Sequence, residues 1–384
     1  MLRTGKPCLR YYWKMKVLQL GKFYPIRGGV EKVMWDLTCG LSARGIDCDM
    51  LCAELEKDEV IHLNGHGRVI CVKAWRKLAA TMIAPKMVSW LKKHKDEYDI
   101  IHVHHPDPMA CLALRRSGYK GRVVLHWHSD ILKQKTLLKF YAPLQRWLIH
   151  RADKIVGTTP VYLKESPYLK DVQDKTVAVP IGIKPVSFDE KLATEWKERY
   201  PGKKLVVSIG RLVPYKGYGY LVAAAESLGS DYQILIVGDG PVRENLEEEI
   251  RSHGVEGKVK LLGYVEDEEM HALLGACDVF VLSSVMKTEA FGIVQIEAMS
   301  LGKPVIATKV PESGVSWVNA DGESGLNVPI KDSEALAEAI QAICSDADLR
   351  DRLSEGAAER FRNLFTIEKM IDKTIKIYTD EKHD

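Results

Sequence analysis

Short apolar runs that alternate with helical segments occupy almost the whole chain, and this alternation limits the possible folds more than any other feature. The runs of the first half are Lys16–Leu20, Asp47–Ala53, Val69–Val72, Ile100–His104, Val123–His126, Lys154–Gly157 and Thr176–Val179. Those of the second half are Lys204–Gly210, Gln233–Val237, Val259–Leu262, Val279–Leu282, Pro304–Ala307 and Gly325–Val328. Strands that alternate with helices form parallel sheets covered by helices. The sequence therefore predicts an α/β protein with doubly wound, Rossmann-like sheets.

A length of 384 residues suits two domains. The segment Pro180–Pro185, rich in proline and glycine, has the composition of a hinge between them. We predict a mobile extension over 1–14, a first domain over 15–182, a second over 183–362, and a C-terminal helical segment over 363–384. The closing helices are expected near Ser333–Cys344, Ala347–Asn363 and Ile367–Thr379.

The net charge of +3 hides an asymmetry between the two halves. Residues 1–184 hold 32 Lys and Arg against 17 Asp and Glu, which leaves 23 of the 55 cations and 35 of the 52 anions to the remainder. A basic half suits an anionic membrane surface or nucleic acid. The sequence contains no nucleic-acid motif, so we expect no nucleic-acid partner.

Targeting and redox signals point to the cytoplasm. No apolar run approaches the ~18 residues of a membrane span, and the N-terminus lacks the apolar centre of a signal peptide. The eight cysteines and twelve histidines show no metal-ligand spacing, so the thiols indicate a reducing compartment. We expect no metal site and no cofactor.

The segment Ala79–Lys95 is predicted to be an amphipathic helix, with apolar residues among four lysines and with Trp75, Arg76 and Lys77 just before it. Such a helix can lie on a membrane surface. It can equally pack its apolar side on its own sheet, and the sequence leaves both interpretations open.

The stretch Ser283–Gly302 carries the clearest chemical signal. After a buried strand and a loop, a helix is predicted from about Phe291, apolar almost all round and therefore buried. Its lone carboxylate, Glu297, lies eight residues after Glu289, roughly 12 Å along the axis at ~1.5 Å per residue. The free N–H groups of the helix start form an anion site between them, and Gly292 admits a close ligand. A nucleotide-sugar, with hydroxyls at both ends and phosphates in the middle, fits this layout; the alternative is two surface glutamates beside an ordinary helix.

Two loops at strand ends carry further candidates. Arg211 and Lys216 follow the first strand of the second half, at the carboxyl edge where open α/β sheets bind ligands. Two cations there suit a diphosphate, and the alternative is a solvated basic loop. Gly28 and Gly29 follow the first strand of the chain, without a G-x-G-x-x-G pattern. They allow a phosphate or sugar to approach the backbone, or they form a plain tight turn.

His128 stands at the carboxyl end of a first-half strand, in L-H-W-H-S-D. In an extended strand His126 points the same way and Trp127 the opposite way. A lone histidine is usually structural, and His102, His104 and His105 are expected to be so.

The motif E-A-F-G-I-V-Q-I-E closely resembles the E-x7-E motif of family 4 retaining glycosyltransferases, which have the GT-B fold. G-R-L-V-P-Y-K-G is similar to their G-R-x-x-x-x-K-G pattern, and the resemblance covers nearly the whole chain after residue 14. The segment H-W-H-S-D-I-L-K-Q-K is most similar to bacterial mannosyltransferases of surface-polysaccharide assembly. The resemblance implies two Rossmann-like domains facing across a cleft, with a C-terminal helix crossing back to the first domain.

The resemblance also implies roles for individual residues. His128 and Glu289 are the catalytic candidates, with His128 near the donor sugar and Glu289 on its hydroxyls. The donor-binding candidates are Gly28, Gly29, Arg211, Lys216, Val265, Phe291, Gly292, Ile293 and Glu297. Among these, Glu297 is expected on the ribose and Val265 at the nucleobase. Asp130 is a weaker candidate for contact with the acceptor.

The function expected from these features is a retaining, metal-independent hexosyltransferase. Its donor is a nucleotide-sugar, with GDP-mannose favoured over a UDP-sugar, and its acceptor is a hydroxyl of a glycan, plausibly lipid-linked. We expect it at the inner face of the cytoplasmic membrane, as a peripheral protein in surface-polysaccharide synthesis. Two alternatives are a nonhydrolysing nucleotide-sugar epimerase, which needs further acid–base carboxylates, and a catalytically silent scaffold for another transferase.

Overall fold

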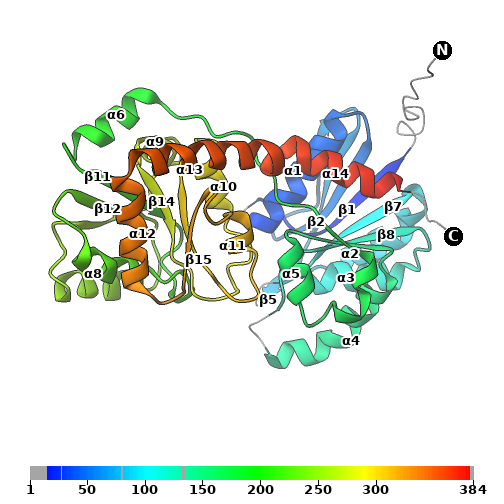
Figure 1. Ribbon diagram of the computed structural model, residues 1–384. Helices are drawn as coiled ribbons and strands as arrows, with labels where there is room; N and C mark the ends of the chain where they lie inside the picture. The colour runs from blue at the N-terminus through cyan, green and yellow to red at the C-terminus, as the bar shows by residue number, and fades with distance from the viewer. Residues whose placement is uncertain (1–14, 27, 79–80, 132–134, 381–384) are drawn as a thin grey trace, which may run out of the picture. The chain divides into compact units, whose positions relative to one another are not determined.

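The computed structural model describes residues 15–26, 28–78, 81–131 and 135–380, with the side chains of 135–140 left out. The chain forms two compact units (Figure 1). Unit 1 comprises Met1–Ile181 and Ile367–Asp384, and unit 2 comprises Gly182–Thr366. These divisions fall one residue before the first expected domain boundary and four residues after the last. The expected extension over 1–14 lies outside the described residues.

Unit 1 contains an eight-stranded sheet in the order β10-β9-β8-β7-β1-β2-β4-β3. Its strands are β1 (Lys16–Phe23), β2 (Asp47–Glu54), β3 (Glu59–Asn64), β4 (Gly67–Lys73), β7 (Ile100–His105), β8 (Arg122–Trp127), β9 (Lys154–Gly157) and β10 (Thr176–Ala178). Neighbouring strands are parallel except β3, an edge strand antiparallel to β4. The sequence analysis missed β3, whose residues alternate between partly and fully exposed.

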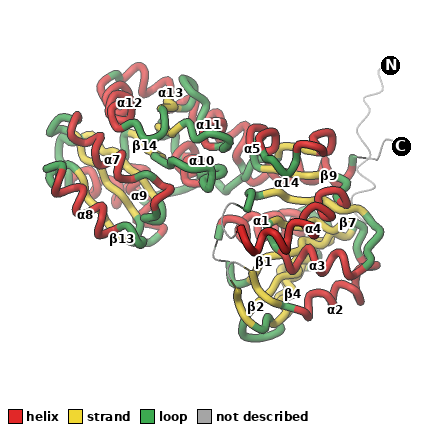
Figure 2. Tube along the Cα trace, turned by 90° about the horizontal axis from the view of Figure 1, so that it is seen from below, coloured by secondary structure: helices red, strands yellow, loops and turns green. Residues whose placement is uncertain are grey.

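The helices of unit 1 are α1 (Gly29–Ala43), α2 (Pro85–His94), α3 (Pro108–Ser117), α4 (Lys135–Arg151), α5 (Pro160–Glu165) and α14 (Ile367–Thr379). Figure 2 shows strands flanked by helices, the layering of a doubly wound domain. The last helix, α14, lies beside α1 (Figure 1), where Gly40 leaves room for Ile371. The C-terminal helix is thus part of the first unit, as the fold class predicts.

The predicted helix Ala79–Lys95 is wrong in its first part. Arg76–Leu78 (β5) and Thr81–Ile83 (β6) form a two-stranded antiparallel sheet, and residues 79–80 lie outside the described chain. α2 begins at Pro85 because proline, which lacks an N–H, favours the first helical position. Met87 and Leu91 of α2 are fully buried. The apolar side of α2 therefore packs within its own unit, and the membrane-surface interpretation of this helix is not retained.

Unit 2 contains a six-stranded parallel sheet in the order β13-β12-β11-β14-β15-β16. Its strands are β11 (Lys204–Ile209), β12 (Tyr232–Val237), β13 (Val259–Gly263), β14 (Val279–Leu282), β15 (Val305–Thr308) and β16 (Gly325–Val328). Its helices are α6 (Glu190–Glu198), α7 (Tyr218–Ala224), α8 (Arg243–Ser252), α9 (Asp267–Ala276), α10 (Ile293–Ser300), α11 (Val315–Val318), α12 (Ser333–Ser345) and α13 (Ala347–Arg360). If these six strands are numbered 1 to 6 in the order of the chain, their order in the sheet is 3-2-1-4-5-6. The direction of winding therefore reverses between β11 and β14. Open α/β sheets bind their ligands at such a switch point, beyond the carboxyl ends of the strands.

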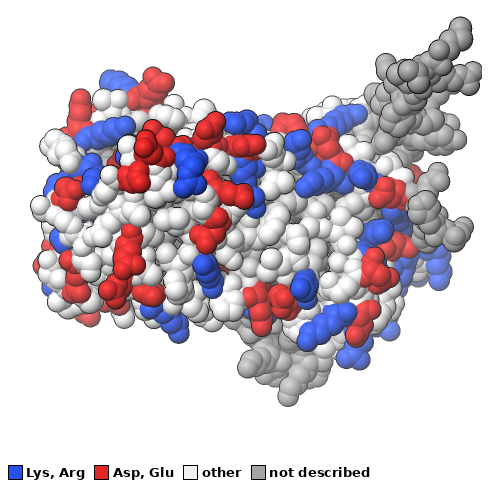
Figure 3. Space-filling model, in the orientation of Figure 1, with Lys and Arg blue, Asp and Glu red and all other residues white. Residues whose placement is uncertain are grey.

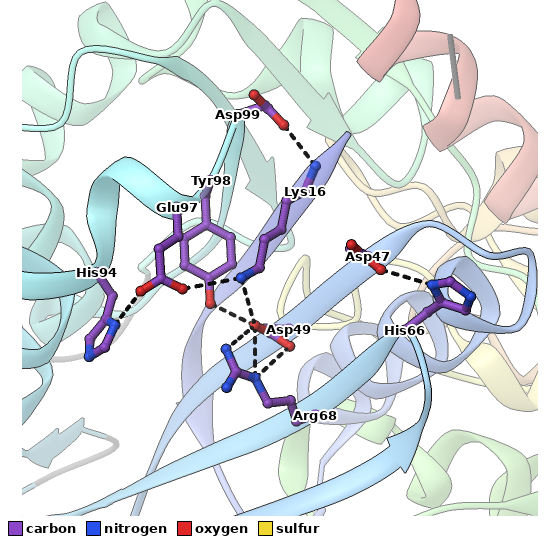
Figure 4. A network of polar contacts seen from close by, with 9 residues as sticks. All are labelled: Lys16, Asp47, Asp49, His66, Arg68, His94, Glu97, Tyr98 and Asp99. Atoms are coloured by element: carbon purple, nitrogen blue, oxygen red, sulfur yellow. Dashed lines mark hydrogen bonds and ion pairs between the residues drawn. The ribbon is translucent and has the colours of Figure 1, made fainter. Parts of the chain in front are cut away.

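In the sheet of unit 1, a polar network lies at the amino ends of the strands, opposite their carboxyl ends (Figure 4). The buried carboxylate of Asp49 accepts hydrogen bonds from the Arg68 guanidinium at 2.9 Å and from the Tyr98 hydroxyl at 2.7 Å. The Lys16 ammonium lies 4.0 Å from the same carboxylate and 4.8 Å from the centroid of the Tyr98 ring. A carboxylate without water needs such partners. These charges therefore have a structural role, and the chemistry is to be sought at the carboxyl edge.

Candidate functional site

The loops that follow β11 and β14 meet at the switch point of unit 2. The backbone N–H of Val285 donates to the carbonyl of Tyr215 at 2.8 Å, and the Ser283 hydroxyl donates to the carbonyl of Lys216 at 2.9 Å. Gly217 allows this approach, because its φ is +66° and a Cβ there would lie 2.3 Å from the Ser283 carbonyl oxygen. The two loops therefore form one structural element at the edge of the sheet.

This junction brings Lys216 and Glu289 into direct contact. The Lys216 ammonium lies 2.6 Å from the Glu289 carboxylate, and the two side chains are only 10% and 13% exposed. The Ser284 hydroxyl donates to the same carboxylate at 3.3 Å, and a Cβ on Gly210 would lie 3.1 Å from the Lys216 nitrogen. The sequence analysis assigned these two residues to different parts of a ligand. The structure shows them as one charged pair. A ligand that binds one of the two residues is therefore also exposed to the charge of the other.

The helix α10 begins at Ile293, two residues later than predicted. Gly292 adopts φ +76° and ψ +68°, which ends the loop in the left-handed region, and a Cβ there would clash with Leu282. Among the described residues, no side chain caps this helix start. The N–H of Gln295 donates to the Gly292 carbonyl at 2.9 Å, and the N–H groups before it are available to an anion. The Phe291 ring is buried and packs edge-on against Phe365, so Phe291 can offer a ligand its backbone and not its ring.

Glu297 lies one turn further along α10. The helix is buried on one side only, through Gln295, Ile296, Ala298 and Met299, while Glu297 is partly exposed. The prediction of a helix buried all round is thus wrong. Within the described part of the chain, the Glu297 carboxylate has no hydrogen bond or ion pair, and burial, helped by Asp267, raises its pKa to about 7. A carboxylate held without a partner at the edge of a site is suited to accept hydrogen bonds from ligand hydroxyls.

Arg211 and Val265 complete the predicted donor residues of unit 2. Arg211 lies two residues after β11 and is exposed, and none of the described residues forms a hydrogen bond or ion pair with its guanidinium. Val265 is partly buried two residues after β13, next to Tyr264, whose side chain is 74% exposed. Both lie at the same carboxyl edge as the Lys216–Glu289 pair.

In unit 1, His128 follows β8 at the carboxyl edge of its sheet. Its ring stacks on His126 with centroids 4.0 Å apart, while Trp127 stacks on His105 at 3.9 Å, so the predicted alternation of directions is confirmed. His104, expected to be merely structural, is hydrogen-bonded to His128, with Nδ1 of His104 lying 2.9 Å from Nε2 of His128. Both rings are buried, which lowers their pKa values well below the usual range.

The donor atoms of His102, His104 and His126 lie within 4.8 Å of one another, which raises the possibility of a metal site. The three rings are stacked, with interplanar angles of 14–23°. Nitrogen lone pairs lie in the ring plane, so in this stack they run side by side and do not converge on a point ~2.0–2.1 Å away, as zinc requires. Both His104 nitrogens are also already hydrogen-bonded. The cluster as it stands does not fit a metal ion.

The remaining predicted residues of unit 1 are two glycines at the start of α1 and the buried Asp130. Gly28 precedes α1 in extended conformation and Gly29 opens the helix, which no described side chain caps. Asp130 is buried, and its carboxylate accepts hydrogen bonds from the Trp127 indole at 3.0 Å and the Ser166 hydroxyl at 2.7 Å. These local bonds fix the position of the Asp130 carboxylate, and its contact with the acceptor stays a prediction.

Several buried polar residues of unit 1 were not predicted. Gln19 and Tyr378 are buried and hydrogen-bonded to the histidine cluster. Lys22 is also buried, with φ +58°, and its ammonium donates to the carbonyl of Pro106. Burial lowers the pKa of Lys22. A glutamine in the middle of β1 and a lysine near its end, in a largely apolar strand, were the available sequence signal.

Comparisons with known families agree with this architecture. A family model described as "Glycosyltransferase Family 4" matches residues 27–185, and one described as "Glycosyl transferases group 1" matches residues 191–360. The chain is 34% identical to O-antigen chain mannosyltransferase C of Escherichia coli, over 95% of this chain and 98% of that protein. It is 29% identical to a phosphatidyl-myo-inositol mannosyltransferase of Mycobacterium leprae, over 88% of this chain and 90% of that protein.

Solved structures share the fold at lower identity. The Anabaena protein HepE in complex with UDP superimposes with a TM-score of 0.76 at 20% identity, over 96% of this chain and all of that one. A glycosyltransferase from Rickettsia africae gives a TM-score of 0.74 at 21% identity, over 96% of this chain and 99% of that one.

Proposed function

The chain belongs to family 4 of the glycosyltransferases, with the GT-B fold, and from this premise we propose a retaining hexosyltransferase that uses a nucleotide-sugar. The family and the relatives support a role in polysaccharide biosynthesis. The observation that carries the proposal is the buried Lys216–Glu289 pair at the switch point of unit 2. Beside it lie the start of α10, which no described side chain caps, and Glu297, which has no partner among the described residues.

In the proposed mechanism each group has a task. Arg211 and Lys216 neutralise the diphosphate, and the start of α10 donates N–H groups to it. Glu297 accepts hydrogen bonds from the ribose hydroxyls and Glu289 from the sugar hydroxyls. As the glycosidic bond breaks, charge develops on the departing phosphate, which preorganised cations stabilise more than water can. The acceptor hydroxyl attacks from the face that the phosphate leaves and gives its proton to a phosphate oxygen.

For the donor we favour GDP-mannose. The support is the similarity to two proteins named mannosyltransferases, at 34% and 29% identity. A UDP-sugar is the alternative, since the structural neighbours that contain UDP inform the fold alone. The names of the same relatives, with O-antigen and phosphatidyl-myo-inositol in them, support a glycan hydroxyl on a lipid-linked molecule as the acceptor.

The product is expected to keep the α configuration of the donor. Inversion needs a base on the far side of the sugar, and double displacement needs a carboxylate nucleophile at the anomeric carbon. Glu289 is the nearest candidate nucleophile, but it is held by Lys216 and assigned to hydroxyls. The experiment incubates purified protein with GDP-mannose or UDP-glucose and a glycan acceptor, follows nucleoside diphosphate release, and records proton NMR of the fresh product.

A β-anomeric signal would contradict the retaining mechanism. Release of nucleoside diphosphate also separates the alternatives. A silent scaffold releases none, and an epimerase returns an altered nucleotide-sugar without needing the acceptor.

Activity is expected to survive chelation of divalent metals. Arg211 and Lys216 already supply positive charge to the diphosphate, which is the task that a metal performs in other transferases. The measurement compares initial rates with and without excess EDTA. Loss of activity that magnesium or manganese restores would contradict the proposal.

We also propose that unit 1 contacts an anionic membrane at the cytoplasmic face. Within the described residues, no helix is long and apolar enough to cross a bilayer. Figure 3 shows both signs of charge intermixed on the face drawn there. The β5–β6 hairpin offers a local feature, because the side chains of Trp75 and Leu78 are 76% and 49% exposed and Arg76 and Lys77 lie between them. Aromatic and apolar side chains flanked by cations favour the headgroup region.

Cosedimentation with vesicles that contain anionic lipid tests this contact. Replacing Arg76 and Lys77 by serine is expected to weaken binding about 30-fold, since each of the two cations contributes about 1 kcal/mol near the surface. Binding of the wild type should fall as salt rises, because the screening length shortens to ~8 Å near physiological strength. The control replaces Lys191 and Lys260 of unit 2 by serine, with the same change in net charge. Equal binding by both double variants would refute the role of the hairpin.

A further inference from the structure

A chain of four hydrogen-bonded side chains connects the last helix to His128 within unit 1. Nε2 of Gln19 donates to the Tyr378 hydroxyl at 3.0 Å, and Oε1 of Gln19 lies 2.7 Å from Nε2 of His104. Nδ1 of His104 in turn lies 2.9 Å from Nε2 of His128. All four side chains are at most 5% exposed. Since water cannot replace these bonds, each proton in the chain has a defined place.

The amide of Gln19 sets the direction of every bond in the chain. Its oxygen can only accept, so Nε2 of His104 must carry a proton. Burial, with His102, His126 and Lys22 nearby, lowers the pKa of His104 well below the usual range, so its ring holds this one proton. Nδ1 of His104 therefore accepts, and the donor to it is Nε2–H of His128.

The same reasoning fixes the other nitrogen of His128. Burial, with the neighbouring histidines and Lys22, also keeps the pKa of His128 well below the usual range, so this ring too is neutral. With its proton on Nε2, its Nδ1 carries a lone pair. Within the described residues Nδ1 of His128 has no hydrogen-bond partner, and the ring stands at the carboxyl edge of the sheet.

We propose that Gln19, His104 and Tyr378 are positioning residues that fix His128 in the tautomer with its proton on Nε2, so that Nδ1 accepts a hydrogen bond from a hydroxyl of the donor sugar. The hydroxyl in this statement rests on the proposed function, whereas the tautomer is a property of the chain itself. No side chain of the set but His128 touches the substrate.

Tyr378 matters because it gives the Gln19 amide nitrogen an acceptor. Burial raises the pKa of Tyr378, so its hydroxyl keeps its hydrogen, and because Gln19 donates to the oxygen, this hydrogen is directed to Nδ1 of His102, 2.5 Å away. Its oxygen then accepts from Gln19. If the amide turned over, its nitrogen would face His104, and the protons of His104 and His128 would both move to Nδ1. His128 would then offer the sugar a donor in place of an acceptor.

Arg122 holds Tyr378 in position. Its guanidinium donates to the backbone carbonyls of Ile377, Tyr378 and Asp380 at 2.7–3.2 Å, which satisfies the end of α14. The strand β8, which His128 follows, thus begins with the residue that anchors the Tyr378 end of the hydrogen-bonded set.

The direct test is the tautomer of His128 in the full-length protein. Long-range proton–nitrogen correlation spectra of protein labelled with ¹⁵N-histidine distinguish a proton on Nε2 from one on Nδ1, and His128→Gln assigns the signals. We expect His104 and His128 of the wild type to carry the proton on Nε2. Tyr378→Phe and Gln19→Met are expected to give His128 a mixture of tautomers. The control His105→Phe, which keeps the stack on Trp127 on the other side of the strand, should leave the wild-type pattern.

Turnover gives the second measurement. Tyr378→Phe is expected to lower kcat about tenfold through the misplaced hydrogen bond, with the donor KM within about twofold. A wild-type proton on Nδ1 of His128, or unchanged tautomers in both variants, would overturn the proposal. If Gln19→Met does not fold, the milder Tyr378→Phe decides. Failure of the wild type to use any nucleotide-sugar would refute the proposed function, while the spectra would still decide the tautomer.

Discussion

Lys216→Met is expected to lower donor turnover by about 10²–10³-fold, equivalent to about 3–4 kcal/mol of transition-state stabilisation. Lys216 has two tasks in the proposed mechanism. It neutralises the departing diphosphate, and it balances the Glu289 carboxylate 2.6 Å away in a nearly water-free position. Methionine keeps the length of the side chain and removes the charge. The measurement is kcat for nucleoside diphosphate release at saturating donor.

Lys287→Met is the matched control for this prediction. Lys287 lies in the same loop, two residues before Glu289, and pairs with Glu312 at 2.7 Å. Its replacement should leave turnover near the wild-type rate. Lys216→Met combined with Glu289→Gln should lose less than the product of the two single losses, because residues that act as a pair are not additive. Turnover within about threefold of wild type in Lys216→Met would exclude the assigned role.

Glu297→Ala is expected to weaken nucleoside diphosphate binding by about 10–100-fold, since a hydrogen bond to a charged group contributes about 1.5–3 kcal/mol. The nucleoside diphosphate retains the ribose, so the loss should appear without the sugar. Isothermal titration with the diphosphate measures it. Glu268→Ala, at an exposed glutamate of α9, is the control. Unchanged affinity in Glu297→Ala would remove this residue from the ribose site.

The raised pKa of Glu297 adds a pH dependence with a defined sign. The ionised carboxylate accepts hydrogen bonds more strongly than the protonated acid does, and burial raises the pKa of Glu297 to about 7. Affinity for the nucleotide-sugar should therefore rise as pH rises through about 7, with release of a proton on binding. Without ligand, the folded chain holds this proton more tightly than the unfolded chain, so the contribution of Glu297 to stability is complete below the usual glutamate pKa and is lost as pH rises from there to about 7. In Glu297→Gln the affinity should be flat across this range.

The order of strands and helices could be predicted from local pattern, and the exceptions have local causes. The helix expected over Ala79–Lys95 starts at Pro85 because proline suits a first turn, a signal that hydrophobic periodicity does not contain. The edge strand β3 alternates only between partly and fully exposed residues, so it lacks the apolar side by which strands are recognised.

The part of the candidate site that could be predicted is the part that lies in sequence motifs. Glu289, Glu297, Arg211 and Lys216 follow from spacing and resemblance, because each stands in a motif of neighbouring residues. The contact between Lys216 and Glu289 depends on how two loops meet at a switch point, which no local pattern encodes. The bond between Gln19 and Tyr378 joins residues 359 positions apart, and so it becomes visible only in the folded chain.

The return of α14 to unit 1 has a consequence for the order in which a growing chain can fold. Unit 2 is one continuous segment, Gly182–Thr366, and its two ends are joined where the N–H of Ile183 donates to the carbonyl of Phe365 at 2.9 Å. Unit 2 can therefore complete its folding while the residues of α14 are still being synthesised. Unit 1 starts first and lacks a core helix until the C-terminus has left the ribosome, although domains generally fold in the order of synthesis. A stop codon only a few residues before α14 would thus spare the later unit and leave the earlier one without its last helix.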